Sequence, residues 1–597
     1  STPRSAKRTW LPWAAVGLVF VALISISLLL LRTAPQASRL EFALPLQQEV
    51  SHLAISPDGQ MLAFVSPDDA TGSDMLSVMR VGAASATVLP GTEGATYPFW
   101  SPDDAYVAFF ADGKLKKVAA SGGVPQAITT AVDGRGGSWG KQGIIFSPDA
   151  VGWLSFVNPD GSGFAPVTDK VFDGTKEASH RWPVFLPDGD HFLFLSGTFT
   201  DAAQSAVYLG SLSHKEKTFV VKAQSNPGYA NGYFFYLDDK KSLRAVRMDL
   251  SGKVSGDAQI IADLVGYQPS TYWSAFSVSA NGAVVYNPTI GAGLSVLTWY
   301  DRSGRETGHL GNMGVISNPL LSPDGTRVAV DIADAKAGNV NLWISDLKTG
   351  TSSPFTFDAS EDDAAVWSRD QNWIAYRSTV SSFTQIYSKQ VHGVLSPKLV
   401  FDARSSPSKI DWESDLVPNS WSLDSKEILC TMQPVAASSY LALIPTEGGK
   451  LTPFLKTAFS TTNGEISPDG KWVAYASNES GDWEVYVTTF PGAAGKWQVS
   501  RGGGAEPRWR ADGKEIFYIG PKSTITAAPV STAEGTFASG NPVPLFQTQL
   551  RAPVSSSDLF TYDVTKDGQR FLVNRYTRPP NVTPVRIVLN STASLQK

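Results

Sequence analysis

Most of the chain alternates between a short polar turn and a run of residues in which every second position is apolar. The turn Ser56-Pro57-Asp58-Gly59 comes shortly before MLAFVS, and Ser467-Pro468-Asp469-Gly470 comes shortly before WVAYAS. In such a turn, proline presets φ, aspartate accepts hydrogen bonds from nearby backbone N–H groups, and glycine tolerates positive φ. The alternation that follows is typical of a β-strand with one face packed on a neighbouring layer. The pattern therefore predicts many short strands that are joined by tight turns.

The unit of turn and strand recurs through residues 40–597. Twelve copies are recognisable, three of them degraded, and they lie about 45 residues apart. This period is that of one four-stranded blade of a β-propeller. The aspartates at the repeated turn position, which we expect to hold the turns together, are Asp58, Asp103, Asp188, Asp324, Asp370, Asp424, Asp469, Asp512 and Asp567.

A second strand signal, ending in Asp or Gly, follows several of these turns, so that each repeat contains an inner strand, a hairpin and an outer strand. Its clearest copies lie at 242–252, 295–304, 341–350 and 482–492. Tryptophans stand just before five of the turns, and this fixed place predicts packing between blades rather than ligand stacking. They are Trp100, Trp139, Trp367, Trp421 and Trp509.

Twelve blades are too many for one ring, since propellers usually have four to eight. The sequence therefore predicts an all-β fold of two tandem six-bladed β-propellers, the first over residues 40–314 and the second over 315–597. A split into seven and five blades, with strands exchanged between the rings, is the alternative. The strands predicted at 40–46 and 585–589 are both available to close a ring.

The segment 11–31 contains no charged residue and is long enough to cross a membrane as one transmembrane α-helix. Residues 1–10 carry three basic residues and 32–39 carry two, which favours a cytoplasmic N-terminal stub at 1–10. A cleaved signal peptide is the alternative, but its apolar region is usually shorter. We expect a single-pass protein of the cytoplasmic membrane, anchored through 11–31, with periplasmic or extracellular propellers.

Composition narrows the choice of function. Charged residues make up 18% of the chain, aromatic residues make up 11%, and the net charge is −5. This balance argues against disorder and against a nucleic-acid partner, which requires a basic surface. The single cysteine, Cys430, excludes intrachain disulfides and multi-cysteine zinc sites, and its apolar strand predicts a buried thiol.

No motif nominates a catalytic residue, a metal site or a cofactor. Ser138 stands in a G-x-S-x-G string, but a strand is predicted after it, whereas the nucleophile elbow requires a helix there. The six histidines show no metal-binding spacing, and Glu361-Asp362-Asp363 fits a solvated acidic loop. Ligand-binding residues stay unassigned, because the sequence does not reveal which loops meet at a propeller mouth.

Longer strings carry a resemblance to a known family. The turn and its strand resemble the WD-like repeat of TolB-type β-propellers. The strings at 90–118, 180–194, 477–491 and 496–518, together with the preceding apolar segment, resemble the extracytoplasmic C-terminal half of bacterial membrane-bound serine/threonine protein kinases. The resemblance implies a sensor region preceded by a cytoplasmic kinase domain. No kinase motif occurs in this chain, so no kinase residue is carried over.

These observations predict a membrane-anchored sensor or protein-interaction platform that binds a protein, a peptide or an envelope ligand at a propeller mouth. We expect it to be the sensor half of a receptor-type serine/threonine kinase, and the first residue, Ser1, suggests a piece of a longer protein. The native protein would then be an enzyme whose catalytic half lies upstream. The alternative is a stand-alone TolB-like envelope protein in transport or envelope integrity.

Overall fold

The protein is described here by a computed structural model. It covers residues 38–595 except 45, 47, 69–72, 151, 170–178, 199–203, 269–270, 290–293, 334–338, 358–359, 381–382, 394, 406–414, 435–437, 533–534, 551–559 and 578–581. The apolar segment 11–31, predicted to cross a membrane, lies outside the described residues. Within the described ranges, no helix is long and apolar enough to span a bilayer.

The described chain is all-β, as predicted, and its helical elements are three short 3-10 turns. These are η2 (Ala403–Ser405), η3 (Pro521–Ser523) and η5 (Ala593–Leu595). The strands form antiparallel sheets, most of them four-stranded, which is the form of a propeller blade. The sheets fall into two sets.

The first set contains the sheets β2-β3-β4-β5, β6-β7-β8-β9, β10-β11-β12-β13, β14-β15-β16-β17, β18-β19-β20-β21 and β24-β25-β51-β1, with the small sheet β22-β23 beside them. Its strands are β1 (Leu40–Ala43), β2 (His52–Ile55), β3 (Met61–Pro67), β4 (Asp74–Arg80), β5 (Thr87–Val88), β6 (Thr96–Trp100), β7 (Tyr106–Ala111), β8 (Lys114–Ala119), β9 (Gln126–Thr130), β10 (Gly137–Trp139), β11 (Ile144–Phe146), β12 (Ser155–Val157), β13 (Ala165–Pro166), β14 (Ser179–Phe185), β15 (His191–Gly197), β16 (Ala206–Ser211), β17 (Thr218–Lys222), β18 (Gly228–Ala230), β19 (Tyr233–Leu237), β20 (Leu243–Met248), β21 (Val254–Ala262), β22 (Tyr267–Gln268), β23 (Trp273–Ser274), β24 (Phe276–Val278), β25 (Val284–Tyr286) and β51 (Arg586–Leu589).

The second set contains β28-β29-β30-β31, β32-β33-β34-β35, β36-β37-β38-β39, β40-β41-β42-β43, the five-stranded sheet of β44 to β48, and β49-β50-β26-β27. Its strands are β26 (Ser295–Asp301), β27 (Glu306–Gly314), β28 (Ile316–Leu321), β29 (Arg327–Ala333), β30 (Val340–Asp346), β31 (Ser352–Pro354), β32 (Glu361–Trp367), β33 (Trp373–Val380), β34 (Phe383–Gln390), β35 (Lys398–Asp402), β36 (Asp415–Trp421), β37 (Glu427–Gln433), β38 (Tyr440–Pro445), β39 (Thr452–Leu455), β40 (Thr461–Ile466), β41 (Trp472–Ser477), β42 (Glu484–Thr489), β43 (Trp497–Gln498), β44 (Ala505–Trp509), β45 (Glu515–Gly520), β46 (Thr524–Ser531), β47 (Ala538–Ser539), β48 (Val543–Gln547), β49 (Tyr562–Val564) and β50 (Arg570–Tyr576).

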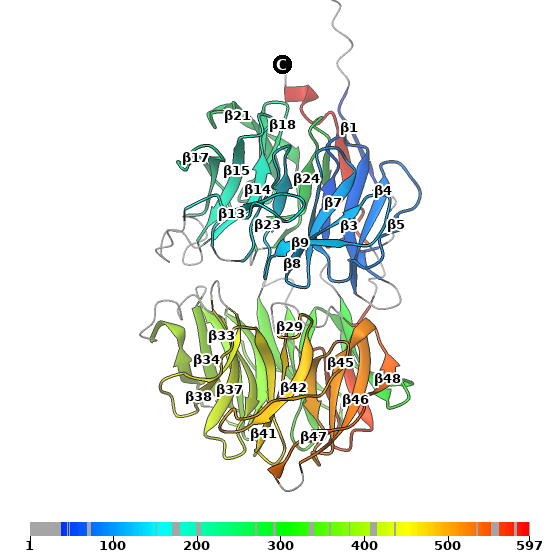
Figure 1. Ribbon diagram of the computed structural model, residues 1–597, viewed down its shortest axis with the longest axis vertical. Coiled ribbons are helices and arrows are strands. Elements are labelled where there is room, and N and C mark those ends of the chain that lie inside the picture. The colour runs from blue at the N-terminus through cyan, green and yellow to red at the C-terminus, as the bar shows by residue number, and fades with distance from the viewer. Residues whose placement is uncertain are drawn as a thin grey trace, which may run out of the picture.

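Within each set the first strands of successive sheets lie side by side, and the order returns to its start. In the first set β2 contacts β6, β6 contacts β10, β10 contacts β14, and β24 contacts both β18 and β2. In the second set β28 contacts β32, and the same relation continues through β36, β40 and β44, while β49 returns to β28. Buried clusters join the remaining neighbours, as where Phe517 and Phe571 pack with ring centroids 5.2 Å apart. The two sets form two lobes, one above the other (Figure 1).

The last sheet of each set combines distant parts of the chain. Strand β26 pairs with β50, with Leu297 opposite Asn574, so residues 295–314 belong to the second set. Strand β51 lies between β25 and β1, and both chain ends therefore close the first lobe, as Figure 1 shows. The prediction had placed residues 295–314 with the preceding repeats, because an alternating strand pattern does not encode which sheet edge the strand will join. The strands predicted near 40 and 585 pair with each other in this sheet.

The tryptophans before the turns join neighbouring sheets, as predicted. The indole N–H groups of Trp100, Trp367 and Trp509 donate to backbone oxygens of the preceding inner strand, over 2.9, 3.2 and 3.1 Å. Trp421 differs, because it donates to the oxygen of Ser425 in its own turn. Cys430 is a buried free thiol in the core of the second set, also as predicted.

Candidate functional site

The inner strands of both sets bend at one repeated position, four residues before the turn. Here the strand loses register with its neighbour, and a residue with a side chain adopts a positive φ. Such a bulge re-aims a side chain out of the sheet. We call the residues at this position bulge residues; those with positive φ, between 47° and 56°, are Tyr97, Trp182, Asn318, Ala364, Asn463 and Glu506.

In the first set the bulge residues form an aromatic cluster on the axis. Tyr97 and Trp182 come from sheets that are separated by the sheet of β10, yet their ring centroids are 4.8 Å apart. His52 lies 4.2 Å from Tyr97 and 4.8 Å from Trp273. Side chains from sheets that are not neighbours can meet in this way only near the centre of the ring. Aromatic rings therefore fill the first axis.

Charge at the first axis is buried and compensated. Arg135 pairs with Asp133, with one contact between Nη2 and Oδ2 of 2.6 Å. Trp182 Nε1 donates to the backbone oxygen of Thr271 over 3.0 Å. Burial, together with the positive charge of Arg135, lowers the pKa of His52 to about 3. The imidazole is therefore neutral at physiological pH, and the first axis combines aromatic rings with a buried ion pair.

In the second set the axis holds a small polar cavity. It is lined by Asn318, Ala364, Asn419, Arg508 and Phe560, among others. These residues come from alternate sheets of the ring as well as from adjacent ones, which places the cavity on the axis. Its free space is about 20 Å³, enough for about one water molecule. The cavity as it stands therefore has room for one small polar group.

Arg508 is the charged residue that lines this cavity. Its side chain is 4% exposed, its guanidinium lies 3.6 Å from the centroid of the Phe560 ring, and its Nε is 3.5 Å from Asp563 Oδ1. Among the described residues none accepts a hydrogen bond from the guanidinium, and its buried Nε is ion-paired with Asp563 but has no hydrogen-bond partner. A buried guanidinium carries five donors and normally uses most of them. Arg508 thus offers unused donors on the axis.

The two asparagines that line the cavity differ in how many of their side-chain hydrogen-bonding atoms have partners. Asn318 is fully engaged, because its Nδ2 donates to Asp331 Oδ2 over 2.5 Å and its Oδ1 accepts from Phe560 N over 2.9 Å. Asn419 is half engaged: its Oδ1 accepts from Thr431 Oγ1 over 2.6 Å, and its buried Nδ2 has no partner in the described part of the chain. The bond from Thr431 fixes the amide so that the donor is the unused end.

The buried carboxyl groups of Glu506 and Asp563 and the partly buried one of Glu465 lie near Arg508 without lining the cavity. Glu506 Oε2 accepts from Thr561 N and Oγ1 over 2.7 and 2.8 Å, and Asp563 Oδ2 accepts from Leu321 N over 2.7 Å. Burial raises the pKa of Glu465 and of Glu506 to about 7, despite the nearby charge of Arg508. Burial also raises the pKa of Asp563. Asp563 pairs with Arg508, and all three carboxyl groups lie near its charge.

The nine predicted turn aspartates all occupy turns, and each accepts a hydrogen bond from the backbone N–H two residues on, over 2.8 to 3.2 Å. In seven of them the carboxylate also accepts from the Ser or Thr that begins the turn. They are spread around the turn ends of both lobes, so the structure does not bring them together into one site. Their geometry is that of turn formation.

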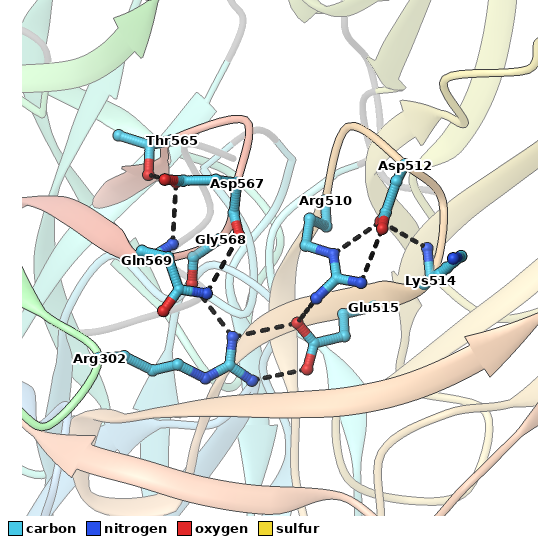
Figure 2. A network of polar contacts seen from close by, with 9 residues as sticks. All are labelled: Arg302, Arg510, Asp512, Lys514, Glu515, Thr565, Asp567, Gly568 and Gln569. Carbon is cyan, nitrogen blue, oxygen red and sulfur yellow. Dashed lines mark hydrogen bonds and ion pairs between the residues drawn. The ribbon is translucent and has the colours of Figure 1, made fainter.

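One turn region carries an extended ionic network (Figure 2). Arg510 pairs with Asp512 and Glu515, and Arg302 from the β26–β27 hairpin reaches Glu515 and the backbone oxygen of Gly568. The charged groups satisfy one another, which makes the network a structural link between the last two sheets of the second set. Ser138 is also structural: it lies in β10, β11 follows it, and its Oγ accepts from Phe185 N over 3.1 Å.

Sequence reasoning did not find the bulge residues. The aspartates and glycines of the turns dominate the repeat, whereas the residue four positions before the turn varies in type. That variation was the available signal: His52, Tyr97, Trp182, Asn318 and Glu506 share one place in the repeat and differ in chemistry. A position that is fixed in the fold and variable in chemistry is a place where a scaffold carries function.

The sheets, their ring order and the axial site define a β-propeller protein. No family model matches the chain. It is 26% identical over 194 residues to the uncharacterized peptidase YuxL of Bacillus subtilis (strain 168), covering 27% of this chain and 29% of that protein. The chain thus matches less than a third of this relative's length.

Three solved structures are similar to the chain. The putative TolB of Agrobacterium tumefaciens has 15% identity and a TM-score of 0.35, over 48% of this chain and 99% of that one. The TolB of Acinetobacter baumannii has 14% identity and a TM-score of 0.31, over 62% and 80%. The tricorn protease has 12% identity and a TM-score of 0.30, over 84% and 63%.

Proposed function

We propose that this chain is a binding platform made of two six-bladed β-propellers, and that the second propeller receives a protein or peptide partner at its axis. The supporting observation is that Arg508 and Asn419, which line one cavity on that axis, each have a buried donor without a hydrogen-bond partner among the described residues. Leaving a buried donor unsatisfied costs about 1–3 kcal/mol. Such groups favour a partner that supplies the missing acceptors.

The test is capture of envelope proteins by the immobilised full chain at physiological salt, followed by identification of what is retained. A matched variant fills the axial mouth: Ala364→Tyr. Ala364 has a φ of 53°, and Tyr97 already occupies the corresponding position of the first propeller with a φ of 47°. The control is Leu423→Tyr, on an exposed turn. We expect a retained protein that is lost with Ala364→Tyr and kept with Leu423→Tyr; retention that is equal in all three chains would argue against an axial site.

The finer parts of the proposal concern the location of the protein in the cell and the domain to which it is attached. We propose that the platform lies outside the cytoplasmic membrane, is anchored by residues 11–31, and is the sensor half of a receptor-type serine/threonine kinase. The apolar segment and the strings at 90–118 and 180–194 support this assignment. Carbonate extraction tests the anchor, because a membrane-spanning protein stays with the membranes. The coding sequence upstream of Ser1 tests the kinase, because a kinase frame either adjoins this segment or does not.

A further inference from the structure

We propose that the axial cavity of the second propeller binds a carboxylate group of its partner through Arg508 and Asn419. This inference rests on the binding role proposed above and names the chemistry of that site. The carboxylate belongs either to a free small acid or to a chain end, and the two sources share one binding geometry.

The unused polar atoms that line the cavity are donors. The guanidinium of Arg508 makes no hydrogen bond to any described residue, and Asn419 presents its Nδ2 because Thr431 occupies its Oδ1. The acceptor capacity of Asn318 is already used by Phe560 N. A planar guanidinium matches a carboxylate with two parallel hydrogen bonds, and an amide donor adds a third. A cationic ligand would meet donors on this lining.

The size of the cavity selects the ligand group. Free space of about 20 Å³ takes about one water-sized atom, so one oxygen of a flat carboxylate enters it more readily than a tetrahedral phosphate, which carries more oxygens. Phe560 packs against one face of the guanidinium at 3.6 Å and holds its plane. The apolar side chains of Leu320, Ala365 and Val366 complete the wall. A charge-assisted hydrogen bond is stronger in such surroundings than in water.

The ionisation of the carboxyl groups near Arg508 determines the pH range in which the carboxylate binds. Asp563 already lies 3.5 Å from Arg508 Nε, and Glu465 and Glu506 stand behind it. Ionised neighbours would repel an incoming carboxylate, whereas protonated ones leave Arg508 free to receive it. Because burial raises the pKa of Glu465 and of Glu506 to about 7, binding strengthens as the pH falls through neutrality.

The experiment measures equilibrium binding of isotopically labelled acetate to the full chain in mild detergent, at constant ionic strength. The decisive variant is Asn419→Asp, which keeps the acceptor for Thr431 and replaces the unused donor by a second oxygen. Arg508→Lys keeps a positive charge beside Asp563 and loses the planar fork. We expect acetate to bind at one saturable site, about tenfold or more weakly in either variant. The matched control is Arg570→Gln, because Arg570 also lies over an aromatic ring, 4.2 Å from that of Trp299, away from the cavity.

A second arm measures binding of the tripeptide Ala-Ala-Ala, with its C-terminal amide as the control that lacks the carboxylate. Stronger binding of the tripeptide acid than of acetate identifies a chain end, and equal binding of these two acids identifies a free small acid. Acetate binding that is unchanged in Asn419→Asp, or no saturable acetate binding to the parent chain, overturns the proposal. If Ala364→Tyr still abolishes capture of a protein in that case, the platform stands and only the carboxylate is lost. If capture fails as well, both proposals fall.

Discussion

Arg302 and Glu515 are 213 residues apart in the sequence and share two hydrogen bonds of 2.6 and 3.0 Å. Arg302 lies in the turn between β26 and β27, and Glu515 begins β45, so the pair joins the last two sheets of the second set (Figure 2). The guanidinium also donates to Gly568 O over 3.1 Å. The segment that connects the two lobes is thereby fastened to the lobe that it completes.

Arg302→Ala should destabilise the second lobe by about 1–2 kcal/mol, because it removes a bidentate ion pair in which the Glu515 side chain is 13% exposed. Denaturant unfolding followed by hydrogen exchange in β45 and β50 measures the effect. Arg305→Ala serves as the control, since that side chain is 79% exposed and its pair with Asp301 is local. Equal effects of the two substitutions would contradict a role for Arg302 in joining the sheets.

The C-terminal strand should be essential to the first lobe and dispensable to the second. Ile587 in β51 is fully buried and lies between Val285 of β25 and Phe42 of β1. Ile587→Asp places an unpaired carboxyl there, and we expect a loss of more than about 3 kcal/mol in the stability of the first lobe. Limited proteolysis should then cut residues 40–287 before residues 295–576. Simultaneous loss of both lobes would show that they unfold as one unit.

Much of the fold is readable from the sequence because its determinants are local. The turn aspartates, the strand alternation and the tryptophans before the turns act within one repeat or between adjacent repeats. The exchange of β26 and β51 is different, because β51 pairs with strands 300 and more residues earlier and any half-buried strand fits the same pattern. The repeated antiparallel sheets are therefore predictable, while the sheet that each closing strand joins is not.

The candidate site could not be predicted from the sequence for a related reason. Arg508, Asn419 and Phe560 lie in different sheets, and their sequence neighbours show no motif. The site exists only because the ring brings the bent parts of several inner strands to one axis. The repeat signals the bulge residues Asn318 and Ala364 of this lining by their constant spacing, but Arg508 and Asn419 lie beside that position and have no such signal.

The turn aspartates should make stability sensitive to acid. Burial raises the pKa of Asp324, but hydrogen bonds from Ser322 and Thr326 outweigh it and bring the pKa to about 2. A lowered pKa means a contribution that is present above the unfolded value of 3.8 and is lost as the pH falls through 2. Asp324→Ala should therefore cost about 1 kcal/mol near neutral pH, a loss that shrinks in acid. Asp257→Ala, at an exposed strand position, is the control, and a loss that is independent of pH would refute the assignment.

Glu506 should change the stability with pH in the direction opposite to Asp324. Its pKa is raised from 4.5 to about 7 by burial, so the folded protein binds more protons than the unfolded chain between these values. Stability therefore falls as the pH rises from 4.5 to about 7, and the full penalty remains above that range. Glu506→Gln keeps an acceptor for Thr561 and removes the ionisation.

We expect Glu506→Gln to be more stable than the parent chain by up to about 3 kcal/mol at about pH 8, and the difference to vanish near pH 5. Denaturant unfolding of both chains across this range measures it. Glu447→Gln is the control, because its side chain is 90% exposed and should give the same small difference at every pH. A difference in unfolding free energy between Glu506→Gln and the parent chain that is the same at every pH would mean that Glu506 is ionised throughout this range. Its negative charge would then already neutralise the positive charge of Arg508.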